Sequence, residues 1–118
     1  MLNLIIKTIQ HNEQRYNTVG DWKDGEVRVS DLGNDNYEFL IGLHELIEMW
    51  LCKENGVAEI DVTSFDLAFV GVGEPGDDIK APYYLEHQFA SGIERLVAQQ
   101  LGVDWLMYEA RCGGIICS

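Results

Sequence analysis

The sequence predicts an α+β fold in which a small N-terminal antiparallel sheet packs against two long helices and shorter ones. Two short runs within the first 30 positions are rich in β-branched and apolar residues, which is typical of strands. In two later stretches, apolar residues recur every three or four positions, which is typical of helices. The chain has 118 residues, a usual size for one domain. We therefore expect residues 1–118 to form a single compact domain.

The sheet is predicted from two strands. Residues 3–9 are apolar and β-branched, and they form the first strand. Residues 27–30 alternate apolar and polar side chains directly after the turn pair Asp24-Gly25, and they form the second. Two strands alone make a marginal sheet. The helices therefore have to cover it.

The first long helix is predicted over residues 37–55. Asn36 is the expected N-cap, and Gly56 stands where a glycine commonly ends a helix. Its apolar positions lie on one face and are expected to be buried: Leu40, Leu43, Ile47 and Leu51.

The second long helix is predicted over residues 82–101. Pro82 suits its first turn, and Gly102 ends it. Its apolar positions form one amphipathic stripe that is expected to face the core: Leu85, Phe89, Ile93, Leu96 and Val97.

Two shorter helices complete the prediction. Residues 61–69 follow the candidate caps Asp61 and Thr63, and their apolar positions are expected to be partly buried: Phe65, Leu67 and Phe69. Asp104 is the expected cap of a last helix that ends near residue 111.

The chain has 8 basic and 20 acidic residues and a formal net charge of −12. This charge argues against nucleic acid and anionic membranes as partners, because both need clustered lysine and arginine. Residues 59–86 contain half of the net charge. No run reaches the roughly 18 apolar residues of a membrane span, and the N-terminus does not resemble a signal peptide. We therefore expect a cytoplasmic protein.

The sequence HELIE at residues 44–48 is the strongest chemical signal. On a helix, His44 and Glu48 lie one turn apart on the same face, so both can bind one cation. Glu45 points away by about 100°, from where it could reach a metal-bound water as general base. Zinc accepts histidine and carboxylate ligands, and manganese also suits an oxygen donor. We therefore expect zinc or manganese at this position.

A third ligand has to come from another element, and His87 on the second long helix is the candidate. It faces His44 and Glu48 if the two long helices pack antiparallel. A structural alternative stays open, in which His44 hydrogen-bonds a carboxylate or a carbonyl and Glu48 pairs with Arg95 or Arg28.

Three further features could belong to a site or to the scaffold. The acidic loop at Glu74, Asp77 and Asp78 could bind a hard cation or a partner, or could be solvated. Residues 16–22 either line a site or cover the edge of the sheet. Cys112 and Cys117 could pair around the Gly-Gly segment, although a reducing cytosol disfavours a disulfide.

Four motifs resemble a group of small proteins from tailed phages and prophages: YNTVGDW (residues 16–22), HELIE (44–48), EPGDD with APY (74–83) and GVDW (102–105). This resemblance implies a phage origin and the host cytoplasm as location. The strand at residues 27–30 followed by HELIE is also similar to the core of minimal zincin metallopeptidases. Those enzymes have a second zinc-binding histidine where this chain has Glu48.

Two functions are expected from these observations. The first is a zincin-like, metal-dependent hydrolase, complete or degenerate, in which His44, Glu48 and His87 hold the ion and Glu45 activates water. The alternative is a non-catalytic phage counter-defence protein that binds a host protein or sequesters a nucleotide signalling molecule. A nucleotide would require arginines to converge, within one chain or across a homo-oligomer interface, and the candidates are Arg15, Arg28, Arg95 or Arg111.

Overall fold

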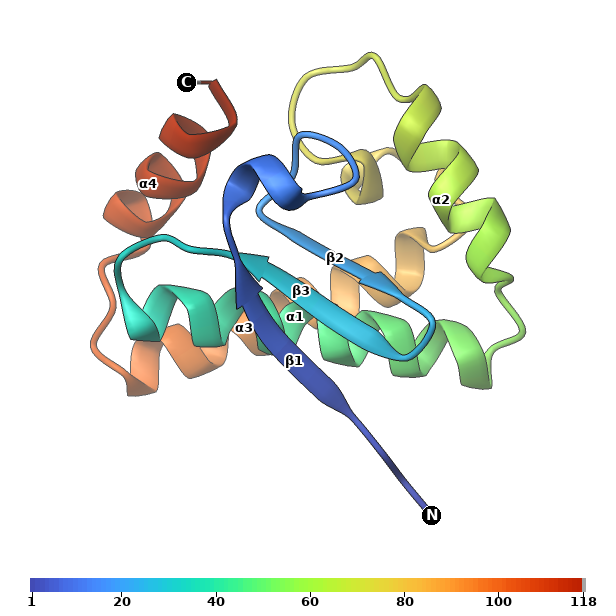
Figure 1. Ribbon diagram of the computed structural model, residues 1–118, viewed down its shortest axis with the longest axis horizontal. Helices are drawn as coiled ribbons and strands as arrows, with labels where there is room; N and C mark the ends of the chain where they lie inside the picture. Colours follow the sequence, from blue (N-terminus) through green and yellow to red (C-terminus); the bar gives the residue numbers. More distant parts are fainter. Residues whose placement is uncertain (118) are drawn as a thin grey trace.

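The computed structural model describes the backbone of residues 1–117 and the side chains of residues 1–116 (Figure 1). Its elements follow one another as β1 (Ile5–Ile9), the 3-10 turn η1 (His11–Glu13), β2 (Gly20–Lys23), β3 (Glu26–Ser30), α1 (Asp35–Glu54), α2 (Glu59–Ala68), the 3-10 turn η2 (Pro75–Asp77), α3 (Tyr84–Gln100) and α4 (Trp105–Cys117). A small N-terminal sheet followed by helices confirms the predicted α+β class.

The sheet has three strands in the order β1-β3-β2. β3 pairs with β2 antiparallel, with Gly20 opposite Val29, and pairs with β1 in parallel, with Ile5 opposite Glu26. The expectation of a purely antiparallel sheet is therefore wrong. Residues 10–19 carry the chain past the central position, so that β2 forms the far edge and β3 returns between the two earlier strands.

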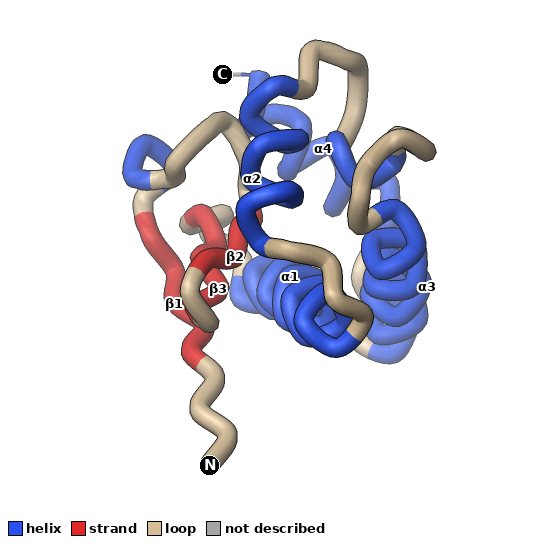
Figure 2. The backbone as a smooth tube through the Cα atoms, turned by 90° about the vertical axis from the view of Figure 1, so that its right-hand side faces the viewer, coloured by secondary structure: helices blue, strands red, loops and turns tan. Residues whose placement is uncertain are grey.

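The molecule is layered, with α1 lying between the sheet and α3 (Figure 2). α1 approaches β1 closely at Gly42, where a Cβ atom would lie 3.1 Å from Ile6 Cγ2. The largest side chains with almost no exposure come from β3, the segment after it and α1: Val27, Val29, Leu32, Leu40 and Cys52. The core thus lies where α1 meets the sheet.

The first long helix is confirmed, with an earlier start than predicted. Asn34, rather than Asn36, caps α1, because its side chain accepts the backbone N–H of Tyr37 at 3.1 Å. Gly56 follows the helix with a φ angle of +74°. A left-handed residue at this position ends the helix as predicted.

The second long helix is confirmed, but the prediction of its buried face is wrong at three of the five positions, since only Ile93 and Val97 are partly buried. Leu85, Phe89 and Leu96 are 74%, 57% and 59% exposed. The side of α3 that faces α1 is instead polar or small: Glu86, His87, Ala90 and Ala98 are buried there. Periodicity identifies two faces of a helix without showing which one is covered, and here the polar face turns inward.

The shorter helices also differ in detail from their predictions. α2 begins at Glu59 and has no side-chain cap, and Leu67 on it is 59% exposed. Asp104 caps α4 by accepting the backbone N–H of Met107 at 3.1 Å, but this helix continues to Cys117 instead of ending near residue 111. The pairing of Cys112 with Cys117, which the sequence allows but a reducing compartment disfavours, lies outside the described side chains. Within the described residues, the helices are too short or too polar to cross a bilayer.

The layered packing predicts which apolar side chains contribute to the free energy of unfolding. Leu40→Ala should lower the free energy of unfolding by about 2–5 kcal/mol, because it leaves a cavity in the core. Leu67→Ala should change it by less than about 0.5 kcal/mol, because exposed positions contribute little. Urea unfolding measures both values, and an equal loss for the two variants would contradict this packing.

Candidate metal centre

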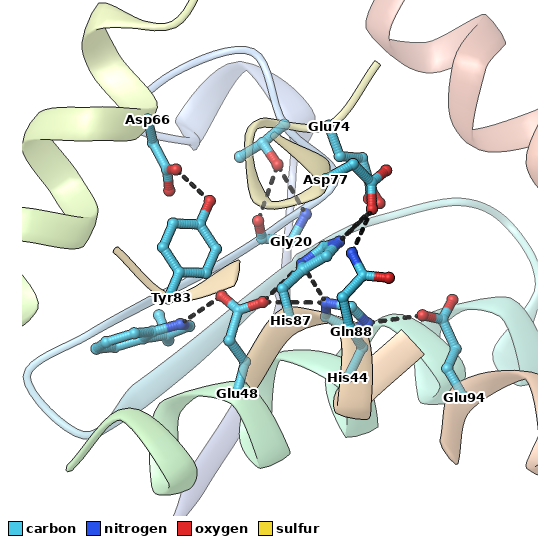
Figure 3. A network of polar contacts seen from close by, with 12 residues as sticks. Gly20, His44, Glu48, Asp66, Glu74, Asp77, Tyr83, His87, Gln88 and Glu94 are labelled. Atoms are coloured by element: carbon cyan, nitrogen blue, oxygen red, sulfur yellow. Dashed lines mark hydrogen bonds and ion pairs between the residues drawn. The ribbon is translucent and has the colours of Figure 1, made fainter. Parts of the chain in front are cut away.

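Three side chains from the two long helices meet between α1 and α3 (Figure 3). His44 Nε2 lies 3.1 Å from Glu48 Oε2, one helical turn further along α1. His87 Nδ1, in the first turn of α3, lies 2.9 Å from the same Glu48 oxygen and 3.2 Å from His44 Nε2. We call these three residues the His–Glu cluster. α1 and α3 run antiparallel, since Asn55 contacts Glu86 and His44 contacts Glu94, and this brings the predicted ligands together.

The cluster has the size of a metal site. Its three facing atoms form a triangle with sides of 2.9, 3.1 and 3.2 Å. A zinc ion with ligands at about 2.0–2.1 Å in tetrahedral geometry separates two ligand atoms by about 3.3 Å. The three side chains, each at most 6% exposed, could therefore hold a metal ion between them.

The outer nitrogens of both histidines contact carboxylates. His44 Nδ1 lies 2.8 Å from Glu94 Oε1, and His87 Nε2 lies 3.1 Å from Asp77 Oδ1. An imidazole that donates its outer N–H to a carboxylate presents a lone pair on the inner nitrogen. Both inner nitrogens then face each other and the anionic oxygen of Glu48, so positive charge is required between them.

That positive charge can be supplied by protons or by a metal ion. Burial alone would lower the pKa of His44, but its hydrogen bonds with Glu48 and Glu94 outweigh burial and raise the pKa to about 11. For His87, contacts with Glu48 and Glu74 outweigh burial in the same way and raise the pKa to about 10. Two imidazolium rings would, however, place two positive charges at nitrogens 3.2 Å apart. One shared cation avoids this repulsion.

Two further hydrogen bonds orient the carboxylates around the cluster. Trp22 Nε1 donates to Glu48 Oε1 at 3.0 Å, which leaves Oε2 for the histidines. The Tyr108 hydroxyl donates to Glu94 Oε2 at 2.6 Å, which leaves Oε1 for His44. Such outer contacts are typical of metal sites, where they fix the direction of each ligand.

One part of the structural alternative is confirmed, because His44 does contact a carboxylate, but the part in which an arginine neutralises Glu48 is wrong. The Arg95 guanidinium stacks 5.0 Å from the ring centre of Trp105, and Arg28 pairs with Glu26 at 2.7 Å. Arg15 binds Asp21, and Arg111 donates to the carbonyl oxygen of Leu32. Among the described residues, each of the four arginines therefore has a partner of its own at a different place in the chain.

A cavity of about 60 Å³ adjoins the cluster. Glu45 lines it together with all three cluster residues, and β2 approaches it at Gly20. A Cβ atom at Gly20 would lie 2.9 Å from Glu45 Cγ and 2.5 Å from Ile41 Cγ2. Glycine at this position therefore keeps the space beside Glu45 open.

Glu45 is half-buried, and among the described residues it has no hydrogen-bond or ion-pair partner. Burial raises the pKa of its carboxyl group well above the usual range, and the nearby charges of Glu48, Asp21 and Glu74 act in the same direction, against His44. An unpaired carboxyl group beside a cation-binding cluster can accept or donate a proton.

The acidic loop contributes only in part. Glu74 and Asp77 are 61% and 57% exposed and stand at the rim, where they contact His87 Nε2. Asp78 turns away and accepts the backbone N–H of Lys80. Gly76 packs flat against the His87 ring, since a Cβ atom there would lie 2.4 Å from it. The loop thus holds the ring in place from one side.

Sequence reasoning missed part of the cavity wall. The hydroxyl groups of Tyr16 and Tyr83 both donate to Asp66, and burial raises the pKa of Asp66 to about 6 although these hydrogen bonds oppose the shift. Residues 16–22, whose role was left open, line the cavity at Tyr16 and orient Glu48 through Trp22. A tyrosine or tryptophan has no local pattern that marks such a role.

No protein family model, curated protein or solved structure matches the chain significantly. The resemblances to phage proteins and to zincins therefore stay predictions.

The hydrogen bond between Trp22 and Glu48 predicts a stability effect. Trp22→Phe leaves a buried carboxylate oxygen without its donor, and it should lower the free energy of unfolding by about 1–3 kcal/mol. Trp50→Phe is the control, because Trp50 is 37% exposed, and it should change that free energy by less than about 0.5 kcal/mol. Equal effects in denaturant unfolding would contradict the proposed importance of this bond.

Proposed function

We propose that the protein is a metal-dependent hydrolase whose ion is held by His44, Glu48 and His87. The observation that supports this most is the buried triangle of ligand atoms, 2.9–3.2 Å on a side, with both outer imidazole nitrogens on carboxylates. Two nitrogens and one oxygen suit zinc, which in hydrolases has three protein ligands and one open position. Manganese also fits this donor set.

Glu45 is the general base of this proposal. Glu45 directly follows the ligand His44 in the sequence and lines the same cavity as the three ligands. It has no hydrogen-bond or ion-pair partner in the described part of the chain. A bound ion would supply Lewis-acid chemistry at the cluster. Glu45 would accept a proton from a water molecule in the cavity as the water oxygen bonds to the carbonyl carbon of an ester or amide. The bond from that carbon to the leaving group would then break as Glu45 returns the proton to the leaving group.

The charge of the cavity restricts the substrate. Its described lining contains no lysine or arginine but five carboxyl groups: Glu45, Glu48, Asp66, Glu74 and Glu94. A divalent ion offsets only part of this negative charge. Anionic substrates such as phosphodiesters are therefore repelled, and neutral or cationic substrates are favoured.

Metal content tests the first part of the proposal. Protein purified without added metal should contain about one equivalent of zinc or manganese by elemental analysis, and His87→Gln should lower it to less than about 0.1 equivalent. His11→Gln is the matched control, because His11 contacts Ser30 and Asn17 outside the cluster, and it should retain the metal. Folded wild-type protein that also fails to bind added Co²⁺ would refute the site.

Hydrolysis tests the second part. Metal-loaded protein should cleave the neutral ester 4-nitrophenyl acetate faster than the anionic bis(4-nitrophenyl) phosphate. Glu45→Gln should lower kcat/KM for the ester by about 100-fold or more while metal content stays unchanged. Glu54→Gln, at the exposed end of the same helix, should have no effect. Metal-loaded wild type with no more activity than Glu45→Gln would refute this catalytic role.

A further inference from the structure

The outer face of α3 carries a row of apolar residues that has no partner among the residues that the structure describes. Leu85, Phe89 and Leu96 are 74%, 57% and 59% exposed. Together with Gly92 they follow one another at steps of four, three and four residues, so they lie in one row along the helix. α1 covers the opposite side of α3, as the layers show (Figure 2). We call the four residues the α3 row.

This row is also the part of the helix that is free of negative charge. The exposed residues of α3 include no acid, because Glu86 is 8% exposed and Glu94 turns inward to His44. The whole chain has a net charge of −12. Two copies repel each other at most orientations, and a face without acidic residues is where they can approach. A basic partner would find no acid on this row to pair with.

The spacing of the row is complementary to itself. If two α3 helices pack antiparallel around a two-fold axis midway between positions 90 and 91, Leu85 lies opposite Leu96 of the second copy. Phe89 then lies opposite Gly92 of the second copy, and symmetry repeats both contacts. A Cβ atom at Gly92 would meet nothing within 4 Å, so this position offers open space for the phenyl ring.

We propose that the α3 row is a homodimer interface in which Phe89 of each copy packs over Gly92 of the other. One pair of helices makes an interface at the small end of the range. The dimer should therefore be reversible, with a dissociation constant on the order of micromolar. The inference does not depend on the proposed function, because the row lies on the opposite side of α3 from His87.

Sedimentation of the full chain between about 1 and 200 µM tests the dimer, since this range brackets a dissociation constant on the order of micromolar. Wild type should shift from monomer to dimer across this range, and Phe89→Glu should raise the dissociation constant at least tenfold. Gly92→Leu should also weaken the dimer, although leucine favours a helix more than glycine does, so a folding defect cannot explain the loss. Leu67→Glu on the exposed side of α2 is the control and should leave the dimer intact.

A cross-link tests the antiparallel arrangement. In a background with Cys112→Ser and Cys117→Ser, a mixture of Leu85→Cys and Leu96→Cys chains should form a disulfide heterodimer on mild oxidation. Each variant alone should cross-link far less. A monomer at every concentration, a dimer unaffected by Phe89→Glu, or equal cross-linking of the single variants would overturn the proposal.

Discussion

The carboxylate of Glu48 lies buried between α1 and α3, where one oxygen faces two imidazole nitrogens and the other accepts the indole N–H of Trp22. Much of the structure follows from the need to compensate this buried charge. α3 has to turn His87 toward α1, and α1 has to lie between the sheet and α3. Leu85, Phe89 and Leu96 are consequently left on the outside of α3, which is unusual for an amphipathic helix.

The candidate site was predictable as far as it depends on local spacing. His44, Glu45 and Glu48 are placed by helical geometry alone, and His87 followed from the assumption of an antiparallel helix pair. Trp22 and Gly76 were not predictable in these roles. Trp22 reaches Glu48 from a strand 26 positions away, and Gly76 matters only because the His87 ring lies against it. Contacts of this kind depend on the tertiary arrangement and leave no periodic signal.

The fold was predictable at the level of its class and its two long helices, because long periodic stretches carry a strong signal. The strand β2 was missed since its four residues, GDWK, do not alternate. The parallel pairing of β1 with β3 was missed because neighbouring strands usually form a hairpin. For α3, hydropathy favoured burial of Leu85 and Phe89, whereas the structure buries Glu86 and His87. Charge compensation at the site outweighed the burial of apolar area.

The side chains around the His–Glu cluster come from β2, α1, the loop before α3, α3 and α4, with Trp22 and Tyr108 at the two ends of the series. A fragment that contains them all must run at least from residue 22 to residue 108. Side chains spread over this range can assemble around the cluster only after the sheet, the helix pair and the last helix have docked, so binding of a metal ion there would be coupled to folding. Occupancy of the site would then report that the entire chain has reached its native state, and loss of the last helix would disturb His44 through Glu94 from more than 60 positions away.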